Sequence, residues 1–392
     1  MLKGYLTKPG SGSQTGDGKG QSTYNPAMLK RIYIDNFRCF VNFEYKPGRK
    51  QLLLGANGSG KSSLLEALRE IKSFIQGAEN PFTQSTRTRW LDSPFQVFEV
   101  EALLDQKDYE YRLEIQYAPD SKLPTIKAEA LKVSGSPVFE FADGEIHFFP
   151  NESAQAPALR WEAAESALHL AQFSNLHVRR FVEWMESVYC FSIDVYPGIM
   201  DEDAESESRL PDFELDNLAK WYRHLIQEDP EGNVNFLTSL REGMNGFLSL
   251  RFATQDGGTR KLWADFEAPS KGRAAYTISE LSDGQRSLIA LYMILHFLIA
   301  KGHTVFIDEP DNFISLREVH PWLLAAEAAV EDSKGQLILI SHHPEILDQW
   351  AQESGLRFFR EENGHVRTEE FRTDPDGLLQ PSELIARGWE ND

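Results

Sequence analysis

The order of apolar and polar positions along the chain predicts an α/β fold. Short apolar runs at residues 51–54, 304–307 and 336–340 are each followed by glycine or polar residues, which is typical of buried strands. Residues 63–71, after the first run, have apolar side chains at helical spacing. Residues 288–300 are apolar almost all round, as expected of a helix that is buried on every side.

Further strands are predicted in the first half of the chain. Residues 31–37 are rich in aromatic and β-branched side chains and alternate over most of their length. Four similar runs, at 95–104, 109–117, 125–133 and 138–149, are separated by turn residues. Sequential strands with short links pair antiparallel, so these four runs predict an antiparallel β subdomain beside the main sheet.

The segment that follows is predicted to be mainly helical. Apolar residues recur at helical spacing in four stretches, residues 161–172, 175–188, 213–227 and 234–242. An acidic loop at 201–207 interrupts them. Strand-like runs at 247–252 and 261–266 then flank Asp256-Gly257-Gly258 and predict a hairpin.

These patterns divide the chain into six parts. Residues 1–27 are rich in Gly, Ser, Thr and Lys and have no apolar core, so they predict a flexible leader and not a secretory signal. This leader is a natural tail, an extension from an upstream start (Met28 precedes the first strand) or a cloning remnant. The other parts are the N-terminal part of the core with its glycine loop (28–93), the antiparallel β subdomain (94–150), the helical insertion (151–245), the C-terminal part of the core (246–360) and a C-terminal tail (361–392).

The composition indicates which cellular environment and which binding partners to expect. No run of about 18 apolar residues occurs, so no membrane span is predicted. The only cysteines, Cys39 and Cys190, give no disulfide framework or zinc site, and a reducing cytoplasm is expected. The formal net charge is −20, whereas proteins that coat nucleic acid are usually basic. DNA binding through a local basic strip stays open, but the charge does not support it.

The first candidate site is a glycine loop between a predicted strand and a predicted helix. It matches G-x-x-x-x-G-K-[ST] at every fixed position. Glycines allow backbone N–H groups to face a phosphate, and a helix N-terminus adds partial positive charge. Lys61 would reach the β- and γ-phosphates, and the Ser62 hydroxyl would bind Mg²⁺. The alternative is a surface turn that contains a lysine by chance. The predicted binding residues are Gly55, Ala56, Asn57, Gly58, Ser59, Gly60, Lys61, Ser62 and Ser63.

A second candidate is the start of the apolar helix near residue 283. Ser282 occupies an N-cap position, and Gly284 and Gln285 lie in the first turn, so this helix end could bind an anion. The alternative is an ordinary capped helix.

Two predicted strands end in further polar residues. Asp308 and Glu309 follow the run 304–307, at the sheet edge where ligands of open α/β sheets bind. Asp308 would hold Mg²⁺, and Glu309 would orient or deprotonate an attacking water. His342 follows the run 336–340 and could bond the γ-phosphate as a neutral imidazole, with His343 a weaker candidate. Strand-end acids and histidines are also common in structural roles.

Together these motifs resemble those of ABC-type ATPases, and more narrowly of the RecF/OLD/SMC-like branch of AAA-family ATPase heads. Residues 28–38 resemble the opening strand of that branch, and 55–62 its Walker A motif. Residues 281–285 resemble its signature motif, 307–310 its Walker B motif, and Ser341-His342 its switch histidine. The resemblance implies a P-loop NTPase fold, ATP and Mg²⁺ as cofactors, and Lys61, Glu309 and His342 as catalytic residues.

The resemblance also implies a homodimer or higher homo-oligomer. Two heads of this family sandwich ATP, so Ser282 and Gly284 would act on the ATP of the partner, while Arg38 would contact phosphate. A switch for a separate effector, in anti-phage defence, is the leading interpretation. The alternatives are a RecF/SMC-like DNA-repair ATPase, a nucleotide sensor that does not hydrolyse ATP, and, less favoured, a transporter subunit.

The sequence also departs from the family pattern. The usual LSGGQ signature is Leu281-Ser282-Asp283-Gly284-Gln285, which adds an acid beside the anion site. Residues 311–315, which Leu316-Arg317 follow, do not end in the aspartate that often ends the D-loop. No Q-loop motif is evident, and Gln172 is the candidate for its glutamine. The chain has no room for a long coiled coil and no acidic cluster of an OLD nuclease, so a head alone is predicted.

Overall fold

The computed structural model describes residues 27–388 except 79, 119–123, 150–158, 161–164, 174, 194–199, 255–259, 271, 363 and 375–376. The predicted leader therefore lies outside the described residues, apart from Ala27. So does the first third of the predicted helix at 161–172.

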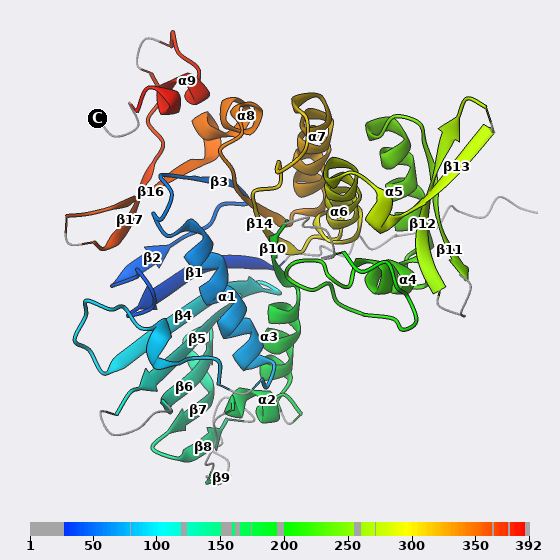
Figure 1. Ribbon diagram of the computed structural model, residues 1–392. Helices are drawn as coiled ribbons and strands as arrows, with labels where there is room; N and C mark the ends of the chain where they lie inside the picture. Colours follow the sequence, from blue (N-terminus) through cyan, green and yellow to red (C-terminus); the bar gives the residue numbers. More distant parts are fainter. Residues whose placement is uncertain are drawn as a thin grey trace, which may run out of the picture.

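A six-stranded sheet lies at the centre of the described chain (Figure 1). Its order is β10 (Val188–Ser192), β14 (Thr304–Asp308), β15 (Gln336–Ile340), β3 (Lys50–Leu54), β16 (Gly355–Arg360) and β17 (Val366–Glu370). All neighbours pair parallel except β16 and β17. Since parallel strands end at one edge, the residues that follow β3, β14, β15 and β16 meet there.

This sheet separates two hydrophobic cores. Val305 and Ile307 of β14 pack into one core with α6 (Asp283–Phe297), α7 (Leu316–Ser333) and α8 (Pro344–Ser354). Phe306, between them, packs into the other core with α1 (Lys61–Ile75). Figure 1 shows α1 on the opposite side of the sheet from α6 and α7. A strand buried on both faces needs apolar residues at consecutive positions, which explains the unbroken apolar runs of the sequence.

An eight-stranded antiparallel sheet packs against the other side of α1. Its order is β2 (Phe43–Tyr45), β1 (Met28–Asp35), β4 (Phe95–Leu104), β5 (Lys107–Gln116), β6 (Thr125–Val133), β7 (Ser136–Ala142), β8 (Glu145–Phe148) and β9 (Leu159–Arg160). The predicted subdomain at 94–150 corresponds to β4 to β8, with the last predicted strand split into β7 and β8. β1 and β2 complete the same sheet, so it also draws on residues before the glycine loop.

The predicted helical insertion contains a strand of the central sheet. Its helices are α2 (Ala167–Ala171), α3 (Leu176–Glu186), α4 (Leu218–Glu228) and α5 (Pro230–Gly243). The helix predicted to run to Val188 ends at Glu186, and β10 then pairs parallel with β14. A helix would leave the edge of β14 unpaired there, so pairing with the sheet overrides the local helical pattern.

The remaining elements also extend the prediction. The predicted hairpin is part of a three-stranded sheet of β11 (Phe247–Thr254), β12 (Arg260–Ala268) and β13 (Gly272–Thr277). The predicted C-terminal tail supplies β17 and α9 (Pro381–Ala386). Short 3₁₀ helices are η1 (Gln84–Thr86), η2 (Ile278–Glu280) and η3 (Ile299–Lys301). Within the described residues, no helix is both long enough and apolar enough to cross a membrane.

Candidate nucleotide-binding site

The glycine loop lies between the end of β3 and the start of α1. Gly55 and Gly60 have φ values of 133° and 112°, which favour glycine. A Cβ on Gly55 would lie 2.1 Å from the carbonyl oxygen of Phe358 in β16, so no larger residue fits there. Gly60 is the N-cap of α1 and provides no side-chain cap, which leaves the first N–H groups of α1 available to an anion.

Lys61 is buried within this loop. Its Nζ donates hydrogen bonds to the carbonyl oxygens of Gly55 at 2.6 Å and Ala56 at 3.2 Å. Burial lowers the pKa of Lys61, while the nearby charges of Asp308 and Glu309 act against that shift. The ammonium is thus held in place at the loop, next to the two acids that follow β14.

Ser62 and Asp308 lie in direct contact. The Ser62 hydroxyl donates a hydrogen bond of 2.6 Å to Oδ2 of Asp308, the last residue of β14. Burial raises the pKa of Asp308, and the hydrogen bond from Ser62 lowers it in part. A hydroxyl and a carboxylate oxygen are hard ligands of the kind that Mg²⁺ prefers, so this pair fits the predicted metal site.

Glu309 follows in a strained conformation. Its φ is 50°, in the left-handed region that side chains other than glycine rarely adopt. The backbone is held there by a 2.8 Å bond from its N–H to the carbonyl oxygen of Ile340. Asn312 Nδ2 donates 2.8 Å to Oε2 of Glu309. The side chain is solvent-accessible and lines the same cavity as Lys61.

His342 faces the same cavity from the end of β15. Burial and the positive charge of Lys61 lower its pKa, so the imidazole is neutral at neutral pH. The preceding Ser341 is fully buried. Its hydroxyl donates a hydrogen bond of 2.5 Å to Oδ1 of Asp311 and accepts one of 2.9 Å from the N–H of His343. His343 is the N-cap of α8, a structural role, and does not line the cavity.

These residues surround one crevice of about 400 Å³. It is lined by Asn57, Gly58, Gly60, Lys61, Ser62, Ser63, Asp308, Glu309, Ile340, His342 and Arg360. Gly55, Ala56 and Ser59 line an adjoining cavity of about 300 Å³ with residues 357–360. The structure therefore brings together the predicted glycine loop, the two acids and the histidine.

The residues of the crevice fit a nucleoside triphosphate with Mg²⁺. The hydroxyl of Ser59 is buried and has no hydrogen-bond partner among the described residues. A buried hydroxyl without a partner is costly, and a phosphate oxygen at the loop would satisfy it. Lys61 would then exchange its bonds to loop carbonyls for phosphate oxygens.

The predicted signature turn lies outside this crevice. The Ser282 hydroxyl caps α6 by accepting 3.3 Å from the N–H of Gln285, and the Gln285 side chain accepts 3.0 Å from the N–H of Ser282. A Cβ on Gly284 would lie 2.7 Å from the carbonyl oxygen of Phe313, in the loop after β14. Ser282 is exposed, and the extra acid Asp283 pairs with Arg286. The turn is therefore accessible to a second molecule.

Two other predicted residues also lie apart from the crevice lining. Arg38 has a φ of 51° and pairs with Glu66 of α1. Gln172 is the C-cap of α2, where its Nε2 donates 2.8 Å to the carbonyl oxygen of His169.

Arg360 is a crevice residue that the sequence did not indicate. It ends β16, and its Nε donates 2.7 Å to the carbonyl oxygen of Gly58, 302 positions away. Its guanidinium lies 5.9 Å from the ring centroid of Trp90. Neither residue belongs to a motif, so only the fold could bring Arg360 to the loop and Trp90 to Arg360.

Two family models match the sequence. The model described as "AAA domain, putative AbiEii toxin, Type IV TA system" matches residues 52–348. A second, described as "AAA domain", matches residues 31–71. No curated protein matches the sequence.

Head domains of SMC proteins have a similar structure. The SMC head bound to the C-winged helix domain of ScpA matches with a TM-score of 0.52 and 12% identity, over 90% of this chain and 99% of that chain. The SMC head domain from Thermotoga maritima gives a TM-score of 0.45 at 13% identity, over 88% and 99% of the two chains. The third is an SMC head domain with an extended coiled coil, bound to the C-terminal domain of ScpA derived from Pyrococcus furiosus. It gives a TM-score of 0.45 at 11% identity, over 93% of this chain and 99% of that chain. The predicted fold class, an α/β P-loop NTPase of ABC type, is confirmed.

Proposed function

Because this chain belongs to the AAA-domain family whose model spans residues 52–348, we propose that it binds and hydrolyses ATP at the crevice described above. The observation that carries the proposal is the convergence of Lys61, the Ser62–Asp308 pair, Glu309 and His342 on one cavity. These residues lie at or after the ends of three neighbouring strands of one sheet, β3, β14 and β15. Each has chemistry suited to a nucleoside triphosphate.

The residues would divide the work as follows. Backbone N–H groups of residues 58–62 and the Lys61 ammonium bind the phosphates, which fixes their position before reaction. Ser62 and Asp308 would hold Mg²⁺, which when bound neutralises charge on the β- and γ-phosphate oxygens. Glu309 orients a water and takes its proton. His342, neutral because of burial and Lys61, donates a hydrogen bond to the γ-phosphate.

We further propose that two copies of the chain complete the site. Ser282 is exposed and the crevice of its own chain does not include the signature turn, so a second copy is free to present that turn to the ATP. The homodimer, or a higher homo-oligomer, would form with ATP and separate after hydrolysis. Such a cycle suits a switch that controls a separate effector, and anti-phage defence is the proposed setting. The free thiols of Cys39 and Cys190 suit the cytoplasm, the proposed location.

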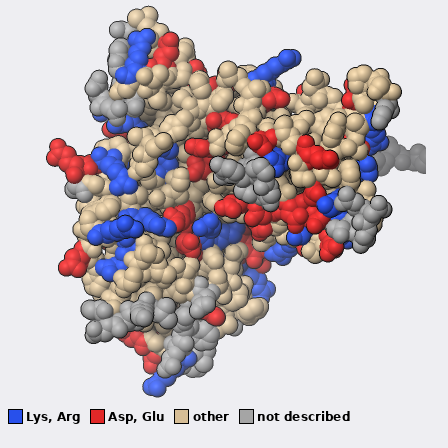
Figure 2. All heavy atoms as spheres, in the orientation of Figure 1, with Lys and Arg blue, Asp and Glu red and all other residues tan. Residues whose placement is uncertain are grey.

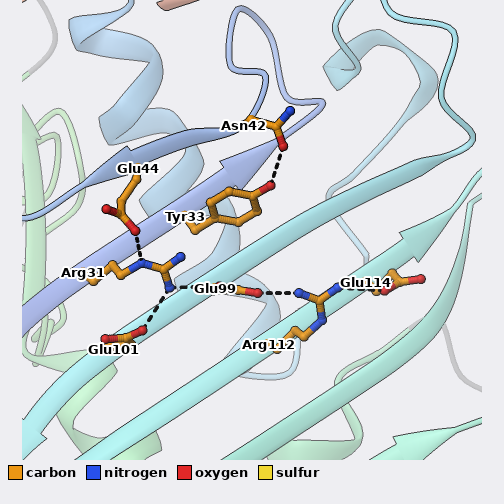
Figure 3. Close-up of polar contacts among 8 residues, drawn as sticks. All are labelled: Arg31, Tyr33, Asn42, Glu44, Glu99, Glu101, Arg112 and Glu114. Carbon is orange, nitrogen blue, oxygen red and sulfur yellow. Dashed lines mark hydrogen bonds and ion pairs between the residues drawn. The ribbon is translucent and has the colours of Figure 1, made fainter. Parts of the chain in front are cut away.

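DNA repair is the second candidate function, and the charge distribution disfavours it. On the outer face of the eight-stranded sheet, Arg31 bonds Glu99 and Glu101 at 2.9 Å each, and Arg112 bonds Glu99 and Glu114 (Figure 3). These arginines are neutralised by glutamates, so the face offers little charge to phosphates. Figure 2 shows blue and red side chains interspersed on one face of the molecule, with red gathered near its centre.

Phosphate release from the purified protein tests the proposal. An ATPase switch releases phosphate with Mg²⁺ and ATP at a rate that DNA does not change. A DNA-repair ATPase would be stimulated by DNA, and the stimulation would fade as salt rises. Negligible turnover, with an oligomeric state that still changes on adding ATP, would identify a sensor that does not hydrolyse ATP.

A further inference from the structure

The turn that carries Trp90 is fixed to the segment after β1. Buried Thr88 donates from its N–H to Oδ1 of Asn36 at 3.2 Å and from its hydroxyl to the carbonyl oxygen of Phe40 at 3.2 Å. The N–H of Leu91 closes the turn on the carbonyl of Thr88 at 3.3 Å. The turn is thus held in place, although the Trp90 side chain at its tip is 48% exposed.

Arg360 connects this indole to the phosphate loop. Its Nε donates to the carbonyl oxygen of Gly58, and its Nη1 donates 3.2 Å to that of Gly364. A Cβ on Gly364 would lie 3.6 Å from the Trp90 ring. Two hydrogen bonds therefore orient the guanidinium, which contacts the phosphate loop through Gly58 and faces the indole of Trp90 at 5.9 Å.

The order of the strands places Arg360 at the opposite side of the phosphate loop from Glu309 and His342. In the central sheet β3 lies between β15 and β16. Glu309 and His342 follow β14 and β15, on one side of the loop that ends β3, whereas Arg360 ends β16 on the other side. A triphosphate whose γ-phosphate faces Glu309 would extend its sugar and base toward the opposite side of the loop.

We propose that Trp90, held by Arg360, is the stacking platform for the base of the bound nucleotide. This inference rests on the proposed ATP binding and adds the subsite that recognises the base. An indole presents a broad π face, and a guanidinium adds cation–π attraction. Stacking on such a platform reads the flat face of a base and not its edge. The site therefore favours purines for their larger ring area over pyrimidines.

The test compares two ligands that share the phosphates. ATP and inorganic tripolyphosphate, each with Mg²⁺, are titrated by calorimetry into the wild-type chain and into Trp90→Phe, Trp90→Leu and Trp90→Ala. Trp90→Leu and Trp90→Ala weaken ATP binding by about tenfold to a hundredfold and leave tripolyphosphate binding unchanged. Trp90→Phe, which keeps an aromatic face, retains most of the ATP affinity. Arg360→Ala weakens the binding of both ligands, because Arg360 also donates a hydrogen bond to Gly58 in the phosphate loop.

The outcomes separate the subsite from the proposed function. Equal losses for ATP and tripolyphosphate in Trp90→Leu, or no loss of ATP affinity, would overturn the platform while ATP binding by the wild type stands. A wild-type chain that binds neither ligand would remove the proposed function and the subsite with it. Melting curves without ligand confirm that each variant is folded, as expected for a side chain that is half exposed.

Discussion

The Ser62 hydroxyl donates a 2.6 Å hydrogen bond to Asp308, although 246 positions of sequence separate the two residues. Ser62 is the second residue of α1 and Asp308 the last of β14, so the bond joins the two halves of the core at the crevice. The local sequence around either residue does not determine that these two side chains touch. It depends on the parallel order of β14, β15 and β3 in the central sheet.

This contact predicts how turnover depends on magnesium. Ser62→Ala removes a metal ligand but no buried packing, since the side chain is exposed. We expect the Mg²⁺ concentration for half-maximal phosphate release to rise by about 10- to 100-fold. Ser73→Ala, which removes a hydroxyl near the other end of α1 and outside the crevice lining, is the matched control and should keep the wild-type Mg²⁺ dependence. Identical titrations for both variants would remove Ser62 from the metal site.

Lys61→Ala should abolish tight nucleotide binding. The lysine supplies the charged donor at the loop, and the loss of charge-assisted hydrogen bonds corresponds to about a hundredfold in affinity. Calorimetric titration with ATP and Mg²⁺ gives the measurement. Lys30→Ala is the control, because Lys30 is an exposed lysine paired with Asp108 away from the crevice. An affinity that survives in Lys61→Ala would mean that ATP binds elsewhere.

Glu309→Gln should separate binding from hydrolysis. The amide keeps the bond from Asn312 but cannot accept a proton from water, so turnover should fall about 100-fold or more. ATP affinity should persist, and the variant should accumulate as an ATP-bound dimer. Light scattering after gel filtration, with and without ATP, measures the mass. Glu345→Gln, altering a carboxylate that pairs with His320, is the control. Wild-type turnover in Glu309→Gln would exclude Glu309 as the base.

The sequence predicts the parts of this molecule that local physics determines. The runs that become β4 and β6 are predicted to the residue, because alternation over nine or ten positions is a strong signal. The phosphate loop is equally local. β10 was missed because its five residues continue the apolar pattern of α3, and only pairing with β14 makes them a strand. Arg360 and Trp90 carry no pattern at all, since the fold alone positions them.

Acid should destabilise the fold through the partly buried His303. Burial lowers the pKa of His303 to about 4, helped by the charges of Lys72 and Lys301. In the unfolded chain this histidine has a pKa near 6.5, so between pH 6.5 and pH 4 the unfolded state binds a proton that the folded state does not. Its contribution to the free energy of unfolding is therefore complete above pH 6.5 and is lost as the pH falls toward 4. We expect about 2 kcal/mol less free energy of unfolding at pH 5 than at pH 7 from this group.

Chemical denaturation at both pH values measures that difference. His303→Phe keeps the ring contact with Tyr189 and removes the titration, so its loss of stability between pH 7 and pH 5 should be smaller than in the wild type. His320→Gln alters an exposed histidine and should behave as the wild type does. An unchanged pH dependence in His303→Phe would show that His303 does not titrate as inferred.

Mixing two inactive variants tests whether one copy completes the site of the other. Gly284→Ala places a Cβ against the Phe313 carbonyl, so it should disrupt the signature turn while ATP still binds the loop of the same chain. Lys61→Ala keeps the turn intact and loses the loop. In a symmetric dimer, a mixed pair has one site with an intact loop facing an intact turn. Random mixing gives mixed pairs in half of the dimers, so phosphate release should return to about a quarter of the wild-type rate. If the turn acted within its own chain, the mixture would stay inactive, because neither variant holds both parts.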